Sequence, residues 1–384
     1  MIISDDIKYV GVNDRKLDMF EGQYKIPNGI SYNSYVIMDE KIAVMDTVDA
    51  GFAEEWLCNL ERVFGDRKPD YLVVHHMEPD HSANIMAFIS RYPDVKIVAS
   101  SRAFIIAKNF FGTDFSERRI IVNEGDVLSL GRHELQFINA PMVHWPEVIM
   151  TYDRLSKAIF TADAFGKFGT LDLEDDWAEE ARRYYIGIVG KYGVQVQNVL
   201  KKISALDVEM ICPLHGPVLR ENLSYYLGLY DTWSSYRPEN DAVLIAYTSI
   251  YGNTKKAVEK LEEGLKAKGE KVHTVDLARC DMFKAVSDAF RYSKLVLATT
   301  TYNGDIFPFM REYIEHLKER NFSNRSIGFI ENGSWAPVAG KIMKTMLEKS
   351  KQLRYYENEV KIFSALGEEN LAQIEALANE ICAE

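Results

Sequence analysis

The chain has 384 residues, 47% of them hydrophobic and 12% aromatic, and at roughly 100 to 200 residues per domain this length favours two domains. Its 45 basic and 57 acidic residues give a net charge of -12, which argues against nucleic acids and anionic membrane surfaces as partners. No apolar run approaches the roughly 18 residues of a membrane span, and the N-terminus lacks the apolar core of a signal peptide, so we expect a cytoplasmic protein with no membrane segment.

The first part of the chain mixes strands in hairpin-like pairs with amphipathic helices. Strand pairs are predicted within residues 31–48, 127–140 and 148–163, and helices over residues 51–64 and 176–192. Adjacent antiparallel strands combined with helices are typical of an α/β sandwich.

A polar stretch with a proline, Tyr236–Asp241, separates this part from a second part with a different pattern. Apolar strands then alternate with amphipathic helices. The strands are predicted over residues 242–249, 271–277, 294–300, 326–333 and 360–366, and the helices over 254–269, 282–293, 308–320, 340–350 and 370–384. Five such units predict a doubly wound parallel sheet, for which we expect the strand order 2-1-3-4-5. We therefore divide the chain into domains of residues 1–240 and 241–384.

Potential metal ligands are concentrated at the end of the strand predicted over residues 71–76. The strand runs directly into four of them, His76, Glu78, Asp80 and His81, and the intervening Pro79 predicts an extended loop instead of a helix. Three more candidate ligands each follow a predicted strand: His144, Asp163 and His215. Because strand ends can hold converging side chains rigidly, these seven residues predict a metal site.

The order and spacing of these residues resemble the metallo-β-lactamase-like domain of the flavodiiron proteins, also called A-type flavoproteins. The resemblance implies an N-terminal αβ/βα sandwich with a non-haem diiron site. It implies two sets of iron ligands joined by a bridging carboxylate: His76, Glu78 and His144; Asp80, His81 and His215; and Asp163 as the bridge. It also places Tyr24 where some oxygen-reducing relatives carry an additional active-site histidine.

The chemistry of the ligands agrees with iron. Hydrolytic zinc enzymes of this fold use a His-x-His-x-Asp-His motif, and here the second histidine position is Glu78. Together with Asp80 and Asp163, Glu78 brings three negative charges to two metal ions. One added negative charge at about 4 Å, in an effective dielectric of about 20, is worth about 4 kcal/mol per unit of metal charge, which favours the ferric state. The replacement therefore converts a hydrolase ligand set into one typical of iron centres that change oxidation state.

The remaining histidines and the cysteines suggest no further site. His75 points away from His76 on an alternating strand, so we expect it to be structural or to support a ligand from behind. His133, His273 and His316 stand in ordinary turn, strand and helix patterns and are predicted to be surface residues. The four cysteines form no Cys-x-x-Cys pair, which argues against a disulfide framework, a cysteine zinc site and a four-cysteine iron centre.

Three loops at strand ends of the second domain carry hydroxyl, amide and glycine residues. They lie at residues 247–254, 299–305 and 332–335. In a doubly wound sheet these strand ends meet at the switch point, where ligands bind. Taken alone, the first loop is also compatible with a plain strand-to-helix turn that has an N-cap. Together the three loops predict an anion site built without lysine, and no G-x-G-x-x-G dinucleotide motif occurs.

This second domain resembles a flavodoxin almost throughout, which implies one bound flavin mononucleotide (FMN). The resemblance places the phosphate against the first loop: Ser249, Ile250, Tyr251, Gly252, Asn253 and Thr254. It places the isoalloxazine ring between the other two loops: Thr301, Tyr302, Asn303, Gly304, Gly333, Ser334 and Trp335, with Trp335 or Tyr302 near the ring.

A metal domain followed by a flavin domain is the order found in flavodiiron proteins, so the resemblance covers essentially the whole chain. It implies an oxidoreductase that receives electrons through FMN and reduces dioxygen to water, nitric oxide to nitrous oxide, or both, at a diiron site. The cysteine pairs of a fused rubredoxin are missing, so we expect an external electron donor, a rubredoxin first and a reduced deazaflavin second. A head-to-tail homodimer or a dimer of dimers is implied, with the flavin of one chain against the metal site of another.

Two functions of other classes are compatible with parts of the pattern. A dinuclear zinc hydrolase with an accessory flavodoxin-like domain would use the same metal domain, but Glu78 and the complete flavin loops argue against it. A non-catalytic electron carrier would use the first domain only as a scaffold, and seven correctly spaced ligands argue against that. Metal analysis separates the zinc hydrolase from the flavodiiron interpretation.

Overall fold

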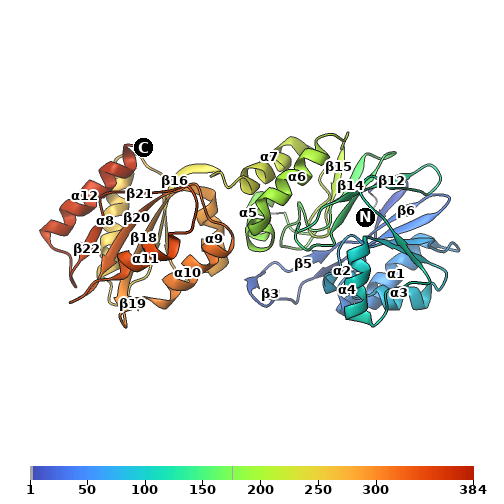
Figure 1. Cartoon of the computed structure of the whole chain (residues 1–384), viewed down its shortest axis with the longest axis horizontal. Coiled ribbons are helices and arrows are strands. Elements are labelled where there is room, and N and C mark those ends of the chain that lie inside the picture. Colours follow the sequence, from blue (N-terminus) through green and yellow to red (C-terminus); the bar gives the residue numbers. More distant parts are fainter. Residues whose placement is uncertain (1–2, 175) are drawn as a thin grey trace. The chain divides into compact units, whose positions relative to one another are not determined.

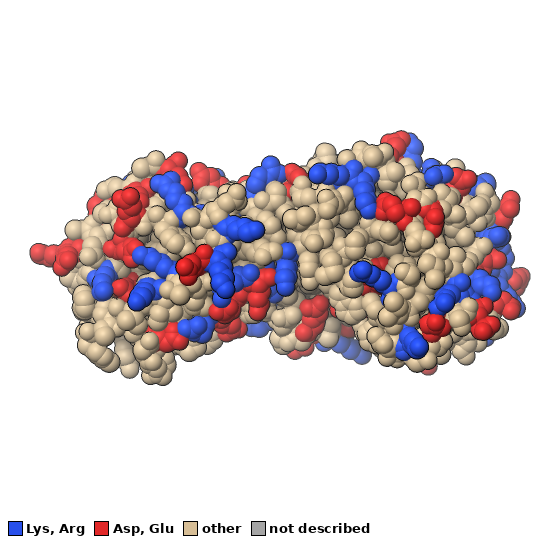
Figure 2. Space-filling model, in the orientation of Figure 1, with Lys and Arg blue, Asp and Glu red and all other residues tan. Residues whose placement is uncertain are grey.

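The computed structural model describes residues 3–174 and 176–384, and the chain divides into two compact units, Met1–Asp231 and Thr232–Glu384 (Figure 1). Helix α7 (Leu223–Ser234) runs across this division, and β16 (Asn240–Tyr247) is the first strand of the second unit. In the described part of the chain, no helix has the length and apolar character needed to cross a membrane. On the face drawn in Figure 2, acidic and basic side chains are intermixed.

The first unit contains two larger sheets, with the strand orders β1-β6-β7-β8-β9-β10 and β11-β12-β13-β14-β15. The strands of the first sheet are β1 (Ile7–Tyr9), β6 (Tyr35–Met38), β7 (Ile42–Met45), β8 (Tyr71–Val73), β9 (Lys96–Ala99) and β10 (Arg119–Ile121). Those of the second are β11 (Val127–Ser129), β12 (Glu134–Asn139), β13 (Ile149–Asp153), β14 (Ala158–Phe160) and β15 (Met210–Cys212). Two short pairs accompany them: β2 (Val12–Asp14) with β5 (Ile30–Tyr32), and β3 (Met19–Phe20) with β4 (Tyr24–Lys25).

The core of this unit lies between its two sheets. Side chains from both sheets form one buried cluster, in which the rings of Tyr35 and Phe160 contact each other with centroids 5.4 Å apart. The predicted hairpin pairs are antiparallel, β6 with β7, β11 with β12, and β13 with β14. The structure therefore confirms the predicted α/β sandwich.

Helices cover the sheets of the first unit on both sides. In Figure 1, α1 to α4 lie below the sheets, whereas α5 to α7 lie to the left of β14 and β15. Helix α1 shows why they dock: it buries Trp56, Leu60 and Phe64, which recur every four residues on one face. The helix bounds are α1 (Ala53–Phe64), α2 (Pro79–Ser82), α3 (Ile85–Arg91), α4 (Ser101–Phe111), α5 (Trp177–Tyr184) and α6 (Gly193–Ile203).

The segment predicted as a helix over residues 176–192 is helical, but its second half is not α-helical. After α5 the chain forms a π-helical turn, Tyr185–Val189, and a 3-10 turn, Gly190–Tyr192, before α6 begins. The Tyr24 hydroxyl donates a hydrogen bond to the Gly187 carbonyl oxygen at 2.8 Å, and a β-carbon on Gly187 would lie 2.7 Å from the Tyr24 ring. Tyr24, which lies outside the helix, thus binds the carbonyl oxygen of Gly187 inside the π-helical turn. The spacing of apolar residues in the sequence does not predict this contact.

The second unit is a doubly wound parallel sheet with the order β17-β16-β18-β20-β21, and β22 also pairs with β20. This confirms the predicted order 2-1-3-4-5. Helix α8 packs against α12, and α10 packs against α9 and α11. Because helices cover the sheet, the residues of its buried strands are apolar. The strands are β17 (Val272–Asp276), β18 (Tyr292–Tyr302), β19 (Asp305–Ile306), β20 (Arg325–Asn332), β21 (Leu353–Tyr355) and β22 (Val360–Ile362). The helices are α8 (Asn253–Ala267), α9 (Met282–Arg291), α10 (Pro308–Glu319), α11 (Ala339–Leu347) and α12 (Glu368–Cys382).

The surface prediction for His133 is wrong. His133 is 1% exposed, and its Nδ1 lies 2.7 Å from an oxygen of Asp153. Its backbone N–H donates to Asp39 at 2.7 Å, and its Nε2 lies 3.3 Å from Asp6. Carboxylates from three distant segments surround the His133 imidazole. The polar turn in the sequence around His133 gives no indication of this burial.

The other two surface predictions fare differently. His273 is exposed, as predicted, and its ring stacks on Tyr292 with centroids 4.5 Å apart. His316 is half-buried, because its ring packs against Phe283 on the neighbouring helix with centroids 4.8 Å apart.

Candidate metal centre and flavin cleft

The end of β8 delivers the first group of predicted metal ligands. His75 and His76 follow the strand, and Glu78 has extended backbone angles, φ -61° and ψ 141°. The predicted extended loop is wrong from Pro79 onward, where the short helix α2 begins with Pro79 in its first turn. Proline is tolerated there because its missing N–H would have no partner within the helix, whereas its ring keeps the preceding residue extended.

The other three predicted ligands come from the second sheet. His144 lies in the loop between β12 and β13, Asp163 follows β14, and His215 follows β15. Strands β14 and β15 are parallel neighbours, so their ends lie side by side. Asp163 and His215 are at most 1% exposed, and His144 is 8% exposed. The site is thus built where strand ends of both sheets meet.

The seven residues gather as two groups, His76, Glu78, His144 and Asp163, and Asp80, His81 and His215. In the first group, the Nε2 atoms of His76 and His144 are 3.2 Å apart, and Glu78 Oε2 lies 3.1 and 3.0 Å from them. In the second, the Nε2 atoms of His81 and His215 are 3.1 Å apart, and Asp80 Oδ2 lies 3.3 and 3.4 Å from them.

Asp163 faces both groups with different oxygens. Its Oδ2 lies 3.0 Å from His144 Nε2, whereas its Oδ1 lies 3.2 Å from His81 Nε2. Neither carboxylate oxygen of Asp163 or of Asp80 has a partner in hydrogen-bond geometry among the described residues, although all four oxygens are buried. Buried polar atoms are ordinarily hydrogen-bonded, so lone pairs that converge in this way fit metal ions between them.

The charges of these side chains are paired. Burial by itself would lower the pKa of His144, but the carboxylates of Asp163 and Glu78 raise it to about 9. Burial would raise the pKa of Glu78, but the imidazoles of His144 and His76 hold it well below its usual range. Metal ions that bind here replace protons on the imidazoles.

Two of the histidines predicted to be ligands are oriented by hydrogen bonds at their outer nitrogens. His76 Nδ1 lies 2.8 Å from Glu147 Oε1, and His215 Nδ1 donates to the Ser31 carbonyl oxygen at 2.7 Å. An Nδ1–H donor leaves the Nε2 lone pair of the same ring free to bind a metal. Both rings therefore present Nε2 to the cluster.

His75 is held apart from the cluster, which confirms its predicted structural role. Its Nδ1 bonds the Asp46 carboxylate, and its Nε2 lies 2.7 Å from the Thr151 hydroxyl. Asp46 also accepts the backbone N–H of His75 at 2.7 Å, so it fixes the chain just before His76.

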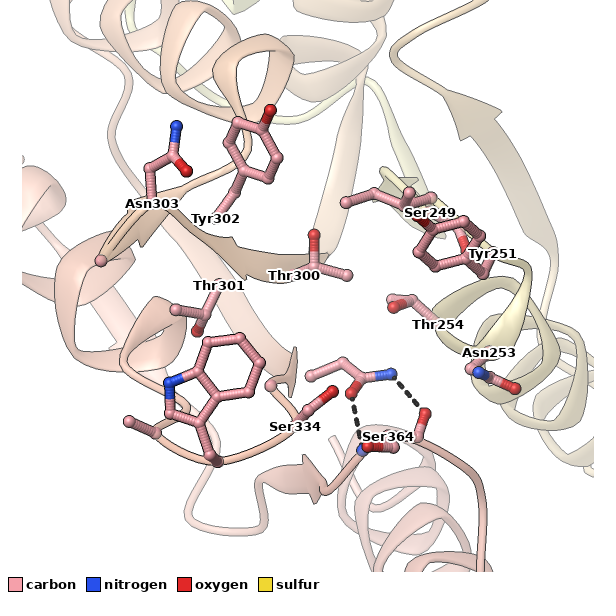
Figure 3. Close-up of a pocket in the computed structure, with 16 residues that line it drawn as sticks. Ser249, Tyr251, Asn253, Thr254, Thr300, Thr301, Tyr302, Asn303, Ser334 and Ser364 are labelled. Atoms are coloured by element: carbon pink, nitrogen blue, oxygen red, sulfur yellow. Dashed lines mark hydrogen bonds between the residues drawn. The ribbon is translucent and has the colours of Figure 1, made fainter.

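The second unit contains a cleft of about 650 Å³ at the carboxyl ends of its strands. Figure 3 shows side chains from separate loops facing it, with Ser249 and Tyr251 on one side and Tyr302 and Asn303 on the other. All predicted flavin residues line the cleft except Gly252, which precedes α8 with φ +88°. Four lining residues are not among the predicted flavin residues: Thr300 and Asn332, which lie within the predicted loops, and Ala336 and Ser364, which lie outside them. Ser364 follows the fifth strand, so the strand-end argument could have found it.

The floor of the cleft suits a phosphate group. The hydroxyls of Thr254 and Thr300 are buried without a hydrogen-bond partner among the described residues. Ser249 Oγ accepts the backbone N–H groups of Gly252 and Lys255, both at 3.2 Å, and so shapes the turn into α8. No lysine or arginine is among the residues that line the cleft. Hydroxyls and the amino end of α8 can therefore bind an anion without a basic side chain.

Aromatic side chains stand at the rim of the cleft. Trp335 is 90% exposed and Tyr251 is 92% exposed, whereas Tyr302 is 43% exposed. Large exposed aromatic side chains beside a cavity mark a binding site for a flat apolar group. The cleft thus combines an anion site with surfaces for ring stacking, which is the chemistry of FMN.

Comparison with known proteins adds the family. Residues 30–216 match the family described as ODP family beta lactamase, and residues 244–367 match a flavodoxin domain. The rubredoxin oxygen:oxidoreductase of Desulfovibrio gigas has a TM-score of 0.93 at 25% identity and covers 100% of this chain and 98% of its own. The flavodiiron protein of Giardia intestinalis has a TM-score of 0.91 at 23% identity, covering 99% and 96%. A nitric oxide reductase of Moorella thermoacetica is 30% identical over 361 residues, 91% of this chain and 90% of its own. The chain belongs to the flavodiiron proteins.

In this flavodiiron protein the β3–β4 hairpin packs against the second ligand group. The ring of Phe20 lies 5.6 Å from that of His215, measured between centroids. The hydroxyl of Tyr24 is used by its bond to Gly187, so the structure does not place Tyr24 as an additional active-site side chain. Glu21, at the turn of the same hairpin, is exposed, and desolvation and the Glu78 carboxylate raise its pKa.

A tyrosine that the sequence did not single out also belongs to the surroundings of the metal site. Tyr184 is fully buried, its ring lies 5.4 Å from that of His215, and its hydroxyl has no hydrogen-bond partner among the described residues. Burial and the carboxylates of Asp163 and Asp80 raise its pKa well above the usual value, so the hydroxyl keeps its proton. The chain has 21 tyrosines, and no spacing marks this one out.

Proposed function

We propose that this flavodiiron protein reduces dioxygen to water, nitric oxide to nitrous oxide, or both, at a non-haem diiron site that receives electrons through FMN. The observation that carries the proposal is the convergence of four histidines and three carboxylates in two adjoining groups, with Asp163 facing both. The relatives support the choice of gases, since one is a nitric oxide reductase and another a rubredoxin oxygen:oxidoreductase.

We assign the ligands as two sets: His76, Glu78 and His144 for one iron, Asp80, His81 and His215 for the other, and Asp163 as the bridge. The inward Nε2 atoms and the unpartnered oxygens of Asp80 and Asp163 support this assignment. When bound, the two irons supply electrons in pairs to a diatomic gas. Glu78 supplies the charge that a hydrolytic site lacks, and Tyr184 holds a hydroxyl proton beside the cluster.

We assign one FMN per chain to the cleft of the second unit. Its phosphate would lie against residues 249–254 and its ring between residues 301–304 and 333–335. Support comes from the buried, unpartnered hydroxyls of Thr254 and Thr300 and from the exposed rings at the rim. The proposed phosphate site contains only neutral donors, so N–H and O–H groups that point at the phosphate would stabilise its negative charge.

The electron donor and the assembly complete the proposal. We propose a rubredoxin as external donor, with a reduced deazaflavin as the second choice, and a head-to-tail homodimer or dimer of dimers as the working form. A rubredoxin is the donor that the name of the Desulfovibrio gigas relative states. We place the protein in the cytoplasm, where reducing conditions keep its four free cysteines as thiols.

Metal and flavin analysis of protein from iron-replete cells tests the assignment. We expect about two irons and one FMN per chain. A yellow protein that carries two zinc ions and stays inactive after reconstitution with iron would contradict the redox function and favour the hydrolase. One FMN with no metal would favour a simple electron carrier.

A further inference from the structure

Glu147 lies behind the first ligand group, in the loop between β12 and β13. It is 2% exposed, and a single oxygen, Oε1, serves two partners. This oxygen lies 2.8 Å from His76 Nδ1 and accepts the backbone N–H of Met77 at 2.9 Å. One carboxylate therefore fixes both the ring of His76 and the backbone that leads to Glu78.

The loop that carries Glu147 is itself anchored. The Ser100 hydroxyl donates to the Glu147 carbonyl oxygen at 2.7 Å, and Ser100 also accepts the N–H of Ala103 as the N-cap of α4. The Ser100 side chain thus joins the amino end of α4 to the loop that carries Glu147. The backbone of Glu147 is therefore tied to the amino end of α4.

The second ligand group has no equivalent carboxylate. His215 Nδ1 is bonded to a neutral carbonyl oxygen, that of Ser31, and His81 Nδ1 has no hydrogen-bond partner among the described residues. A carboxylate behind a ligand histidine makes the imidazole a better donor to the metal and fixes its orientation, whereas a carbonyl does this less strongly. The two halves of the cluster are therefore built unequally.

We propose that Glu147 is a positioning residue that strengthens metal binding selectively at the half formed by His76, Glu78 and His144. The inference deepens the proposed function, because it assumes that both groups bind metal. It predicts that loss of the carboxylate weakens one metal site of the pair and leaves the other as it is.

Anaerobic titration of the metal-free holoflavoprotein with Fe²⁺ tests this inference without reference to turnover. Wild type should bind two Fe²⁺ per chain. Glu147→Leu removes both hydrogen bonds, and we expect one of the two sites to weaken by about 10- to 100-fold. Glu147→Gln keeps an acceptor oxygen but removes the charge, so it should fold normally and lose less, up to about tenfold.

Double variants identify which half is affected. His144→Ala already disables the first half, so adding Glu147→Leu to it should change the Fe²⁺ affinity of the remaining site little. His215→Ala disables the second half, so adding Glu147→Leu to it should weaken the remaining Fe²⁺ site by the full amount. Asp153→Asn is the matched control, because it removes a buried carboxylate from another histidine of the same unit and should leave both Fe²⁺ affinities unchanged. Mössbauer spectra should show a change in only one of the two iron signals.

The outcomes separate this inference from the function on which it rests. A wild-type protein that binds fewer than two Fe²⁺ contradicts the proposed diiron site. A wild type that binds two, together with Glu147 variants that bind two with unchanged affinities or lose both equally, contradicts the positioning role of Glu147 alone.

Discussion

In the proposed metal site, Glu78 is the residue that distinguishes the ligand set from one built for hydrolysis. Its Oε2 lies within 3.1 Å of the Nε2 atoms of both His76 and His144. A carboxylate at that position contributes about 4 kcal/mol per unit of metal charge at about 4 Å and an effective dielectric of about 20, as an order of magnitude. A neutral imidazole would contribute none of this charge term. Replacing Glu78 should therefore change the stability of the ferric state more than the geometry of the site.

We expect Glu78→His to shift the metal content toward zinc and to suppress oxygen reduction, while the flavin is still reduced normally. Elemental analysis, flavin absorbance and oxygen uptake measure the three effects. Glu124→His, a change of an exposed carboxylate that pairs with Lys202 at 2.7 Å, is the control and should alter none of them. Unchanged turnover of Glu78→His would mean that Glu78 is not a ligand.

Trp335 tests the flavin cleft. Its ring is 90% exposed at the rim, so replacing it with alanine removes stacking surface without opening a core. We expect Trp335→Ala to weaken FMN binding by about 2- to 10-fold, the size of one lost stacking contact, or to shift the flavin spectrum, with iron content retained. Leu371→Ala, at an exposed position of α12, is the control. Equal loss of iron and flavin would indicate general unfolding and would contradict the local role of Trp335.

At the scale of residues, the sequence reveals ligands better than their supports. The seven metal-site residues carry characteristic side chains at strand ends, and the structure brings them together. Glu147 and Asp46 are ordinary acidic residues whose roles arise from contacts with His76 and His75. Those contacts join segments far apart in the chain, so no local pattern could indicate them.

At the scale of elements, two predictions differ from the structure, one for a local reason and one because of a tertiary contact. The sequence predicts an extended loop at Pro79, yet Pro79 begins α2 because the first helical turn needs no N–H from it. The fifth strand of the second unit is divided into β21 and β22, both parallel to β20. Between them, the backbone N–H groups of Glu357 and Asn358 donate to the Glu380 carboxylate of α12 instead of to a strand.

The buried His133 predicts a pH-dependent contribution to stability. Burial by itself would lower its pKa, but the carboxylates of Asp153 and Asp6 raise it above the value of 6.5 expected in the unfolded chain. The stabilisation is therefore complete below that unfolded value and is lost as the pH rises through the folded value. His133→Asn keeps a donor near the Nδ1 position but cannot carry the charge.

We expect His133→Asn to destabilise the protein more at pH 6 than at pH 9, measured by urea unfolding at fixed metal content. The exposed His273→Asn should change the free energy of unfolding little at either pH. A destabilisation by His133→Asn that is equal at both pH values would contradict a charged His133 in the folded protein.

At the scale of the whole molecule, the fold follows from two contrasting patterns. Hairpin-like strand pairs in the first part and alternating strands and helices in the second part require different sheets, and both are present. The strand order of the second unit could be predicted because doubly wound sheets take few topologies. The strand order of the first unit could not, because β1 and β6 pair across small hairpins that intervene in the sequence.

The proposed head-to-tail dimer has a mixing test. A metal-deficient variant, Asp163→Ala with His76→Ala, and a flavin-deficient variant, Gly252→Val with Asn253→Asp, should each be inactive. Gly252 has φ +88°, which a valine adopts only with strain, and an aspartate at position 253 would repel the phosphate. Under conditions that exchange subunits, mixed dimers contain one intact flavin and metal pair, so activity should reappear. Inactivity after verified exchange would contradict transfer between chains.

The most direct test of the central claim compares electron flow in two metal forms of the same protein. Iron-loaded and zinc-loaded protein, each with one FMN per chain, receive electrons from NADH through a supplied rubredoxin and its reductase, and the consumption of dioxygen and of nitric oxide is measured side by side. We predict that the flavin is reduced in both forms and that only the iron form consumes either gas continuously, with water or nitrous oxide as product. Equal gas consumption by both forms, or none by protein with two irons and one FMN per chain, would contradict the claim.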